Sequence, residues 1–420
     1  MKGVWLLIAA LCLGLLLPLT VGASDEAPEA SEVPYSEGQA PAGTTPPEAE
    51  PSEPEDPPEQ SGLFDSELYA LYEEQMELAG ADELAGAVPE EAEEFIERFG
   101  LESLDPAAIL SLDLRDLLGA LWDEMGARLQ APLRLFCYIL AVVLLCALLD
   151  TLSEGKEGAL AGVFRVVAVL FLCAVLLQPM LDCIDRAAGL ISSANTFLLT
   201  YIPIFSAVLL MAGQAASASA YHLILFAIVQ GVSAVASSVL VPLLFCYLAF
   251  CLAASASGEL QLTAIAAFIK KAVTWLLGIA TTVLVGFLSI QSIVAAGADT
   301  VGAKAAKFVI SSTVPVVGSA LSDALLTVKG CVGLLRSSVG VFGILTVTAT
   351  FLPMLLELIA WSLLLRLGAL ASSMFSAKTI TSLLEGVAAT ISMLIAILCS
   401  YLLLITLSTT VLILLGGGTV

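Results

Sequence analysis

Long, uninterrupted runs of apolar residues dominate the chain from Leu133 onward. A helix that crosses the hydrocarbon core of a bilayer needs about 20 predominantly apolar residues. By that measure the pattern predicts an all-α polytopic membrane protein with about eight transmembrane helices. These are expected over Leu133–Leu149, Ala159–Leu181, Leu190–Ala212, Tyr221–Ala254, Ile265–Ala295, Phe308–Leu335, Val339–Leu365 and Ile380–Leu415.

Two pairs of prolines suggest a duplication within this membrane part. Tyr201-Ile-Pro203 resembles Thr313-Val-Pro315, and Leu240-Val-Pro242 resembles Phe351-Leu-Pro353. The distance along the chain from Pro203 to Pro242 is nearly equal to that from Pro315 to Pro353. After the first two transmembrane helices (131–189), the pattern predicts two repeat units, 190–300 and 301–420, with three apolar segments each. With an odd number of membrane segments in each unit, the second unit would be inverted relative to the first, as in many transporters. Because such transporters bind their substrates at broken helices, the four prolines are candidate helix-break positions. The alternative is a chance similarity between apolar segments.

The first residues have the pattern of an export signal. Lys2 precedes the apolar run Val4–Leu17, Pro18 ends the run, and the small residues Val21 and Ala23 precede Ser24. This predicts a secretory signal peptide over residues 1–23, with an uncleaved membrane helix as the alternative. In both cases the chain from Ser24 onward begins on the extracytoplasmic side.

The exported region divides in two. Residues 24–61 are rich in proline and glutamate and have few large apolar side chains, which predicts a disordered acidic linker. In residues 62–130 apolar side chains recur at helical spacing, which predicts amphipathic helices that pack into a cap or dock on a protein partner. The three stripes are Leu63, Phe64, Leu68, Leu71, Tyr72 and Met76; Phe95, Ile96 and Phe99; and Leu114, Leu117, Leu118, Leu121, Trp122 and Met125.

Charge excludes some functions and leaves orientation open. The net charge is −23 and most of the acids lie in residues 24–130, so a basic nucleic-acid-binding surface is not expected. Lys156 and Arg165 would mark a cytoplasmic loop. Under eight spans the remaining basic residues fall on alternating sides, so the positive-inside signal is weak. They are Lys270, Lys271, Lys304, Lys307, Lys329, Arg336, Arg366 and Lys378.

Motifs for catalysis are missing. The chain has one histidine, no G-x-x-x-x-G-K-[ST] phosphate loop, and nine cysteines without C-x-x-C spacing. We therefore expect no catalytic residue, cofactor or metal site, and no enzyme activity. Charged groups at membrane depth are costly and so mark functional candidates, which makes Glu357, Asp323, Arg366 and Glu385 a candidate polar membrane pathway. For Glu357 and Asp323 a structural ion pair is the alternative.

Small residues add a packing prediction. They cluster over Ala215–Ala220, Ser233–Ser238 and Gly330–Gly343. Small side chains let helices approach closely, so these clusters favour tight packing within the bundle or contacts in a homo-oligomer.

Several stretches resemble one family. They are Asp182-Cys-Ile-Asp185-Arg186-Ala, Tyr201-Ile-Pro203, Ser311-Ser-Thr-Val-Pro315-Val-Val-Gly318-Ser-Ala-Leu-Ser322-Asp323 and Lys329-Gly330. Together with the export signal and the acidic exported region, they make the chain similar to the stage III sporulation protein AE family of endospore-forming bacteria.

The resemblance implies a multi-pass protein of the outer forespore membrane, which derives from the mother cell. Such a protein acts with the other stage III A-operon proteins, including a separate ATPase subunit, and with the stage II sporulation protein Q complex. The assembly is a channel or secretion-like conduit that the engulfed forespore needs for development. The alternatives from the residues themselves are a stand-alone secondary transporter using Glu357 or Asp323, and a purely structural scaffold in the lipid bilayer.

Overall fold

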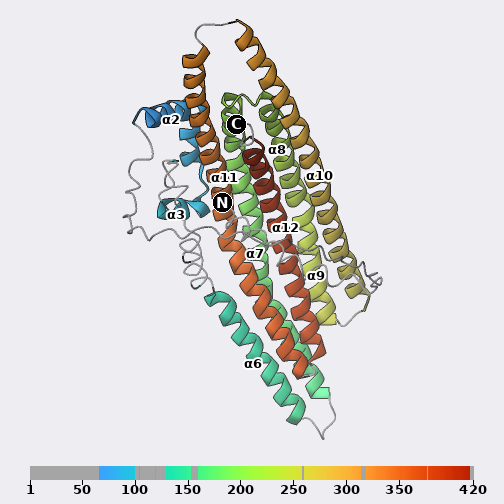
Figure 1. The fold of residues 1–420 in the computed structure, drawn as a ribbon. Coiled ribbons are helices and arrows are strands. Elements are labelled where there is room, and N and C mark those ends of the chain that lie inside the picture. The colour runs from blue at the N-terminus through green and yellow to red at the C-terminus, as the bar shows by residue number, and fades with distance from the viewer. Residues whose placement is uncertain are drawn as a thin grey trace, which may run out of the picture.

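A computed structural model gives the fold of the chain. It describes residues 66–99, 104, 119, 126, 129–152, 159–257, 260–313, 318–375 and 377–416. The expected signal peptide and the acidic linker therefore lie outside the described residues. Within the described ranges every regular element is helical (Figure 1).

The helices form a short N-terminal group and a bundle of long helices. The N-terminal group comprises α2 (Ser66–Ala79), the 3₁₀ helix η2 (Ala81–Ala87) and α3 (Glu90–Arg98). The bundle comprises α6 (Gln130–Leu152), α7 (Ala159–Met211), α8 (Ala215–Val235), the π-helical turn η3 (Ala236–Leu240), α9 (Val241–Ser257), α10 (Leu260–Thr313), α11 (Gly318–Met374) and α12 (Lys378–Gly416).

Five apolar helical segments in the described ranges are long enough to cross a membrane. They are Val166–Met211, Ala215–Ala256, Gln261–Gly302, Gly330–Met374 and Lys378–Val411, and α6 adds the shorter apolar helix Pro132–Leu148. An all-α membrane protein is therefore supported, whereas the count of about eight spans is not confirmed.

The difference in number arises because helices continue where hydropathy falls. The runs Ala159–Leu181 and Leu190–Ala212 lie together in α7, and Val339–Leu365 shares α11 with the end of Phe308–Leu335. A helix is broken by the loss of backbone hydrogen bonds, not by polar side chains. With 53 residues α7 is about 80 Å long at 1.5 Å per residue, well beyond the hydrocarbon core of about 30 Å.

The four candidate helix-break positions have different surroundings. Both α7 and α11 continue through their prolines, Pro203 and Pro353, so neither position breaks its helix. Pro242 lies in the first turn of α9, directly after η3, and Pro315 lies outside the described residues. Membrane helices tolerate proline because neighbouring groups satisfy the freed carbonyl.

The described helices do not divide into the two expected repeat units of three membrane segments each. The chain reverses at Gly213, whose φ of 76° suits a glycine, and its amide donates to the Leu210 carbonyl at 2.9 Å. Pro203 and Pro242 thus lie in antiparallel helices. The second unit, 301–420, contains the end of α10 and only two further described helices, α11 and α12.

The centre of the bundle is formed by α11 and α12. In an apolar stretch of 18 residues within each helix, 72% of the residues of α11 and 78% of those of α12 are buried, against 11% for α10 at the edge. A Cβ at Gly343 would overlap the Tyr201 ring, and one at Gly340 would overlap Ile413. The tight packing expected for Gly330–Gly343 is therefore present between α7, α11 and α12.

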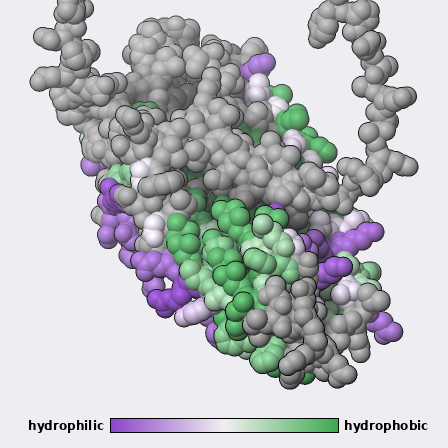
Figure 2. Space-filling view, turned by 90° about the horizontal axis from the view of Figure 1, so that it is seen from below, coloured by the Kyte–Doolittle hydropathy of each residue, from purple (hydrophilic) through white to green (hydrophobic). Residues whose placement is uncertain are grey.

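The outer surface of the bundle is apolar. Figure 2 shows hydrophobic side chains over a continuous area, with hydrophilic side chains at its margins. On α10 the large exposed side chains include Phe268, Trp275, Val283 and Ile290. A surface of this kind is suited to lipid.

The helices of the N-terminal group pack against α7 and α11 at the side of the bundle (Figure 1). The first two predicted stripes are confirmed in part, since Tyr72 of α2 and Ile96 of α3 are buried. The Tyr72 hydroxyl donates to the Leu104 carbonyl at 2.9 Å. The third stripe, over Leu114–Met125, lies outside the described residues except for Gly119.

Candidate functional site

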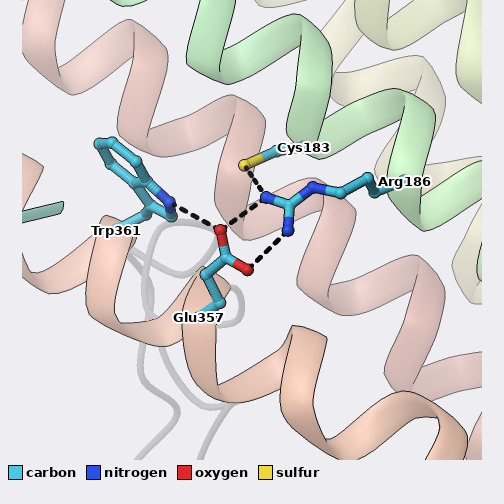
Figure 3. Close-up of polar contacts among 4 residues, drawn as sticks. All are labelled: Cys183, Arg186, Glu357 and Trp361. Carbon is cyan, nitrogen blue, oxygen red and sulfur yellow. Dashed lines mark hydrogen bonds and ion pairs between the residues drawn. The ribbon is translucent and has the colours of Figure 1, made fainter. Parts of the chain in front are cut away.

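A charged pair joins α7 and α11 inside the bundle. Arg186 Nη1 donates to Glu357 Oε2 at 2.8 Å, and Arg186 Nη2 donates to Glu357 Oε1 at 2.6 Å (Figure 3). Two parallel hydrogen bonds between a guanidinium and a carboxylate fix both the distance and the orientation of the groups. The pair therefore sets how α7 lies against α11.

Two neighbouring side chains complete the arrangement. Trp361 Nε1, one turn beyond Glu357 on α11, donates to Glu357 Oε1 at 3.4 Å. Cys183, one turn before Arg186 on α7, accepts from Arg186 Nη2 through its Sγ at 3.8 Å. All four residues come from facing turns of the two helices, as Figure 3 shows.

Burial is unequal between the partners. The Glu357 side chain is 10% exposed, and the Arg186 side chain is 48% exposed. A carboxylate taken out of water needs a close cation, because its uncompensated charge is strongly destabilising. Glu357 thus has the partner expected if it serves in a structural ion pair, which was the alternative to a role in a polar membrane pathway.

The other candidates lie elsewhere. Arg366 is about two and a half turns beyond Glu357, which places it on the opposite face of α11. There it lines a groove between α10, α11 and α12. The side chain of Asp323 lies outside the described residues. The structure brings Arg366 and Glu385 together in this groove and places Glu357 apart from them.

The groove has a volume of about 630 Å³ and a charged lining. Lys270 of α10, Arg366 of α11 and Glu385 of α12 contribute its charges. Arg366 Nη2 donates to Ser392 Oγ at 3.0 Å, and the Ser392 hydroxyl donates to the Ala388 carbonyl at 2.9 Å. We call this the Lys270–Arg366–Glu385 groove.

Sequence reasoning missed Arg186 and Lys270 as site residues. Lys270 was considered only for the orientation of the spans, and only the folded bundle shows which helix each of the two side chains faces. The signal for Arg186 was present, because it belongs to the distinctive stretch from Asp182 to Ala187.

Metal ligation finds no support in the described ranges, where no group of three or more His, Cys, Asp or Glu side chains could hold an ion. None of the cysteines in the described ranges forms a disulfide.

Comparison with known proteins gives two matches. Residues 107–416 match a family model described as stage III sporulation protein AE. Over 235 residues the chain is 23% identical to the stage III sporulation protein AE of Bacillus subtilis (strain 168), and this covers 56% of the chain and 59% of that relative. The chain therefore spans less than two thirds of the relative that it matches. No solved structure matches the chain.

Proposed function

Because the chain belongs to the stage III sporulation protein AE family, we propose that it is a membrane subunit of the channel or secretion-like complex that links mother cell and forespore. Its role there is non-enzymatic and serves forespore development after engulfment. The observation that carries the proposal is the family match, which extends over all of the long apolar helices. The family gives a role in sporulation, and the membrane-length helices are those expected of a subunit that lies in the membrane.

The location follows from the same premise. We place the protein in the outer forespore membrane, with the exported helices α2 and α3 on the extracytoplasmic side, between the two membranes. Glu90, Glu91, Glu93, Glu94 and Glu97 of α3 are exposed, and carboxylates at this density are excluded from hydrocarbon. The acidic face is therefore available to partner proteins.

The partners proposed are the other stage III A-operon proteins and the stage II sporulation protein Q complex. A separate ATPase subunit would supply energy, since the sequence has no phosphate-binding loop. In this arrangement the chain contributes a membrane path or a platform, and nucleotide chemistry takes place on another subunit.

A gene deletion tests the proposal. We expect the deletion strain to complete engulfment and then to stall, and the full-length gene at a second locus to restore heat-resistant spores. A matched control is a strain carrying the same insertion at the second locus without the gene. Normal spore numbers in the deletion strain would refute the proposal.

A second candidate function is a stand-alone secondary transporter. The observation that favours it is Glu357, a nearly buried carboxylate in a helix of membrane length. Purified protein in liposomes would decide between the two. Uptake of a solute driven by an ion gradient, and lost in Glu357→Gln, supports the transporter, whereas no uptake supports a subunit that works only in its complex.

A further inference from the structure

The Lys270–Arg366–Glu385 groove has no part in the proposed function. We propose that it binds one anionic phospholipid of the phosphatidylglycerol type. The lipid phosphate lies between Lys270 and Arg366, the headgroup hydroxyls lie beside Glu385, and one acyl chain lies between α10 and α12. The inference is independent of the sporulation role.

The charges of the groove suit a phosphate ester. Lys270 and Arg366 supply two cations from two helices. A guanidinium has five N–H donors, and the described structure uses one nitrogen of Arg366 for Ser392, which leaves donors for phosphate oxygens. Basic pockets between membrane helices are known binding sites for anionic headgroups.

Glu385 narrows the choice of headgroup. Its carboxylate is exposed in the groove, where it accepts hydrogen bonds and repels a second negative charge. A glycerol headgroup offers hydroxyl donors and adds no charge beyond its single phosphate. The groove as a whole therefore fits a singly charged lipid with a hydroxylated headgroup.

The depth of the groove agrees with a headgroup. Arg366 precedes the end of α11, Glu385 follows the start of α12, and Lys270 follows the start of α10 by about two to three turns, or about 10–15 Å. These helix ends lie at the same end of the bundle, the lower end in Figure 1. Exposed Lys271 and Lys378 lie there too. Long basic side chains reach from this depth to the headgroup level.

A second cavity offers room for the acyl chain. It has a volume of about 330 Å³ and lies between α10 and α12, where Val273, Leu277, Met393 and Ala396 line it. Its lining begins at Val273, about one turn beyond Lys270 on α10, and at Met393, directly after Ser392 on α12. From Lys270 in the groove to Thr282 in the second cavity, the two together extend about 18 Å along α10, which compares with about 15 Å for half of the hydrocarbon core.

A small free anion, such as inorganic phosphate, suits the groove less well than a phospholipid does. Ile359, Leu363, Leu370 and Ile395 line the groove beside its charges, and a small hydrophilic anion gains nothing from them. A lipid fills both cavities and supports α10, which is the least buried of the membrane-length helices described. The lipid source of the phosphate is therefore the one we propose.

Native mass spectrometry of the purified full chain tests the proposal. Phosphatidylglycerol is titrated into micelles that contain phosphatidylcholine, and the bound lipid is counted. We expect Lys270→Gln/Arg366→Gln to bind phosphatidylglycerol about tenfold more weakly, or worse, because two charge-assisted contacts are lost. Lys271→Gln is the matched control, since Lys271 is the next residue on α10 and does not line the groove.

Two further arms keep the test decisive. Ala389→Trp fills the groove without removing charge, and we expect it to weaken lipid binding even if the double variant fails to fold. Glycerol phosphate at millimolar concentration should not displace the lipid. The proposal is overturned by equal retention of phosphatidylcholine and phosphatidylglycerol, by an effect of Lys271→Gln as large as that of the double variant, by unchanged binding in Ala389→Trp, or by displacement with glycerol phosphate.

Discussion

At the scale of single residues, the Arg186–Glu357 pair is the main polar feature inside the bundle. Its two members are not equivalent, because the carboxylate is nearly buried and the guanidinium is half exposed. Loss of the cation leaves a nearly buried carboxylate without its counter-charge, because Trp361 donates a hydrogen bond but carries no charge. Loss of the carboxylate leaves a cation that water or a headgroup can reach. The two single substitutions should therefore have unequal effects.

We expect Arg186→Gln to lower the free energy of unfolding by about 2–4 kcal/mol, and Glu357→Gln by about 1 kcal/mol. The double variant should recover part of the loss, because no charge remains buried. Thermal unfolding of the purified protein in detergent measures all three, with Arg134→Gln on exposed α6 surface as the control. A larger loss in Glu357→Gln than in Arg186→Gln, or a double variant no better than Arg186→Gln, would contradict this account.

The sequence could identify Glu357 but not its partner. A charge in a long apolar run is visible without a structure, and the ion-pair alternative followed from its cost. The same helix offered Arg366, but about two and a half turns of separation turn the side chains to opposite faces. The partner, Arg186, comes from another helix far away in sequence, so only tertiary packing shows the pair.

At the scale of elements, glycines on different helices of the bundle differ in their surroundings. Gly343 faces the Tyr201 ring across the contact between α7 and α11, whereas a Cβ at Gly231 on α8 would meet nothing within 4 Å. An added methyl group has opposite effects in the two places. It overpacks the contact at Gly343, and it stabilises a helix at an open position.

We expect Gly343→Ala to lower the free energy of unfolding by about 1–3 kcal/mol, since the Tyr201 ring must move. Gly231→Ala should be neutral or stabilising by up to about 1 kcal/mol. Denaturation of both variants in the same detergent provides the comparison. If Gly343→Ala were as stable as Gly231→Ala, α7 and α11 would not approach each other as closely as described.

The start of α8 depends on a side chain from another helix. Asp299 of α10 accepts from the backbone amides of Ala216 at 2.8 Å and Ser217 at 2.9 Å, while Gln214 at the N-cap position gives no side-chain cap. A carboxylate at a helix N-terminus satisfies amides that have no partner in the helix and interacts favourably with the helix dipole.

Asp299→Ala should therefore weaken the first turn of α8 by about 1 kcal/mol. Hydrogen exchange is the direct measurement, and we expect faster exchange at Ala216 and Ser217 with little change in α11. Gln214→Ala is the control, because its side chain makes no cap bond. Unchanged exchange at both amides in Asp299→Ala would show that another group caps the helix.

Helix boundaries were the less predictable part of the fold. The apolar runs correctly indicated helices, five of which in the described ranges are long enough to cross a membrane. They could not show that Ala159–Leu181 and Leu190–Ala212 form one helix, since the polar residues between them keep their backbone hydrogen bonds. Pro203 and Pro353 were misleading for a related reason, because one missing N–H is tolerated in a packed membrane helix.

At the scale of the whole molecule, the antiparallel order of the long helices gathers basic residues at one end. Lys270 and Lys271 lie near the start of α10, and Arg366 and Lys378 lie near the turn between α11 and α12. These positions share the lower end of the bundle with the end of α6 and the start of α7 (Figure 1). The eight-span prediction had divided them between the two sides.

We propose that this end is the cytoplasmic one, as expected for the segment of Lys156 and Arg165 between α6 and the start of α7. Lys304 and Lys307 lie toward the opposite end of α10, so the positive-inside signal alone stays weak. The acidic helices α2 and α3 lie away from it, beside α7 and α11, where Ser193 Oγ donates to Glu91 Oε1 at 3.5 Å. On this proposal α2 and α3 face the extracytoplasmic side, and the Lys270–Arg366–Glu385 groove opens at the cytoplasmic leaflet.

Single cysteines in a cysteine-free variant would measure this orientation. We expect Lys378→Cys to react with a membrane-impermeant maleimide only after the cytoplasmic side is opened, and Glu97→Cys to react in intact cells, since both positions are exposed and lie at different levels of the bundle. The variants must first restore spore formation, so that labelling reports a folded protein. Reaction of Lys378→Cys in intact cells would invert the molecule, and would move both the groove and the acidic helices to the opposite faces of the membrane.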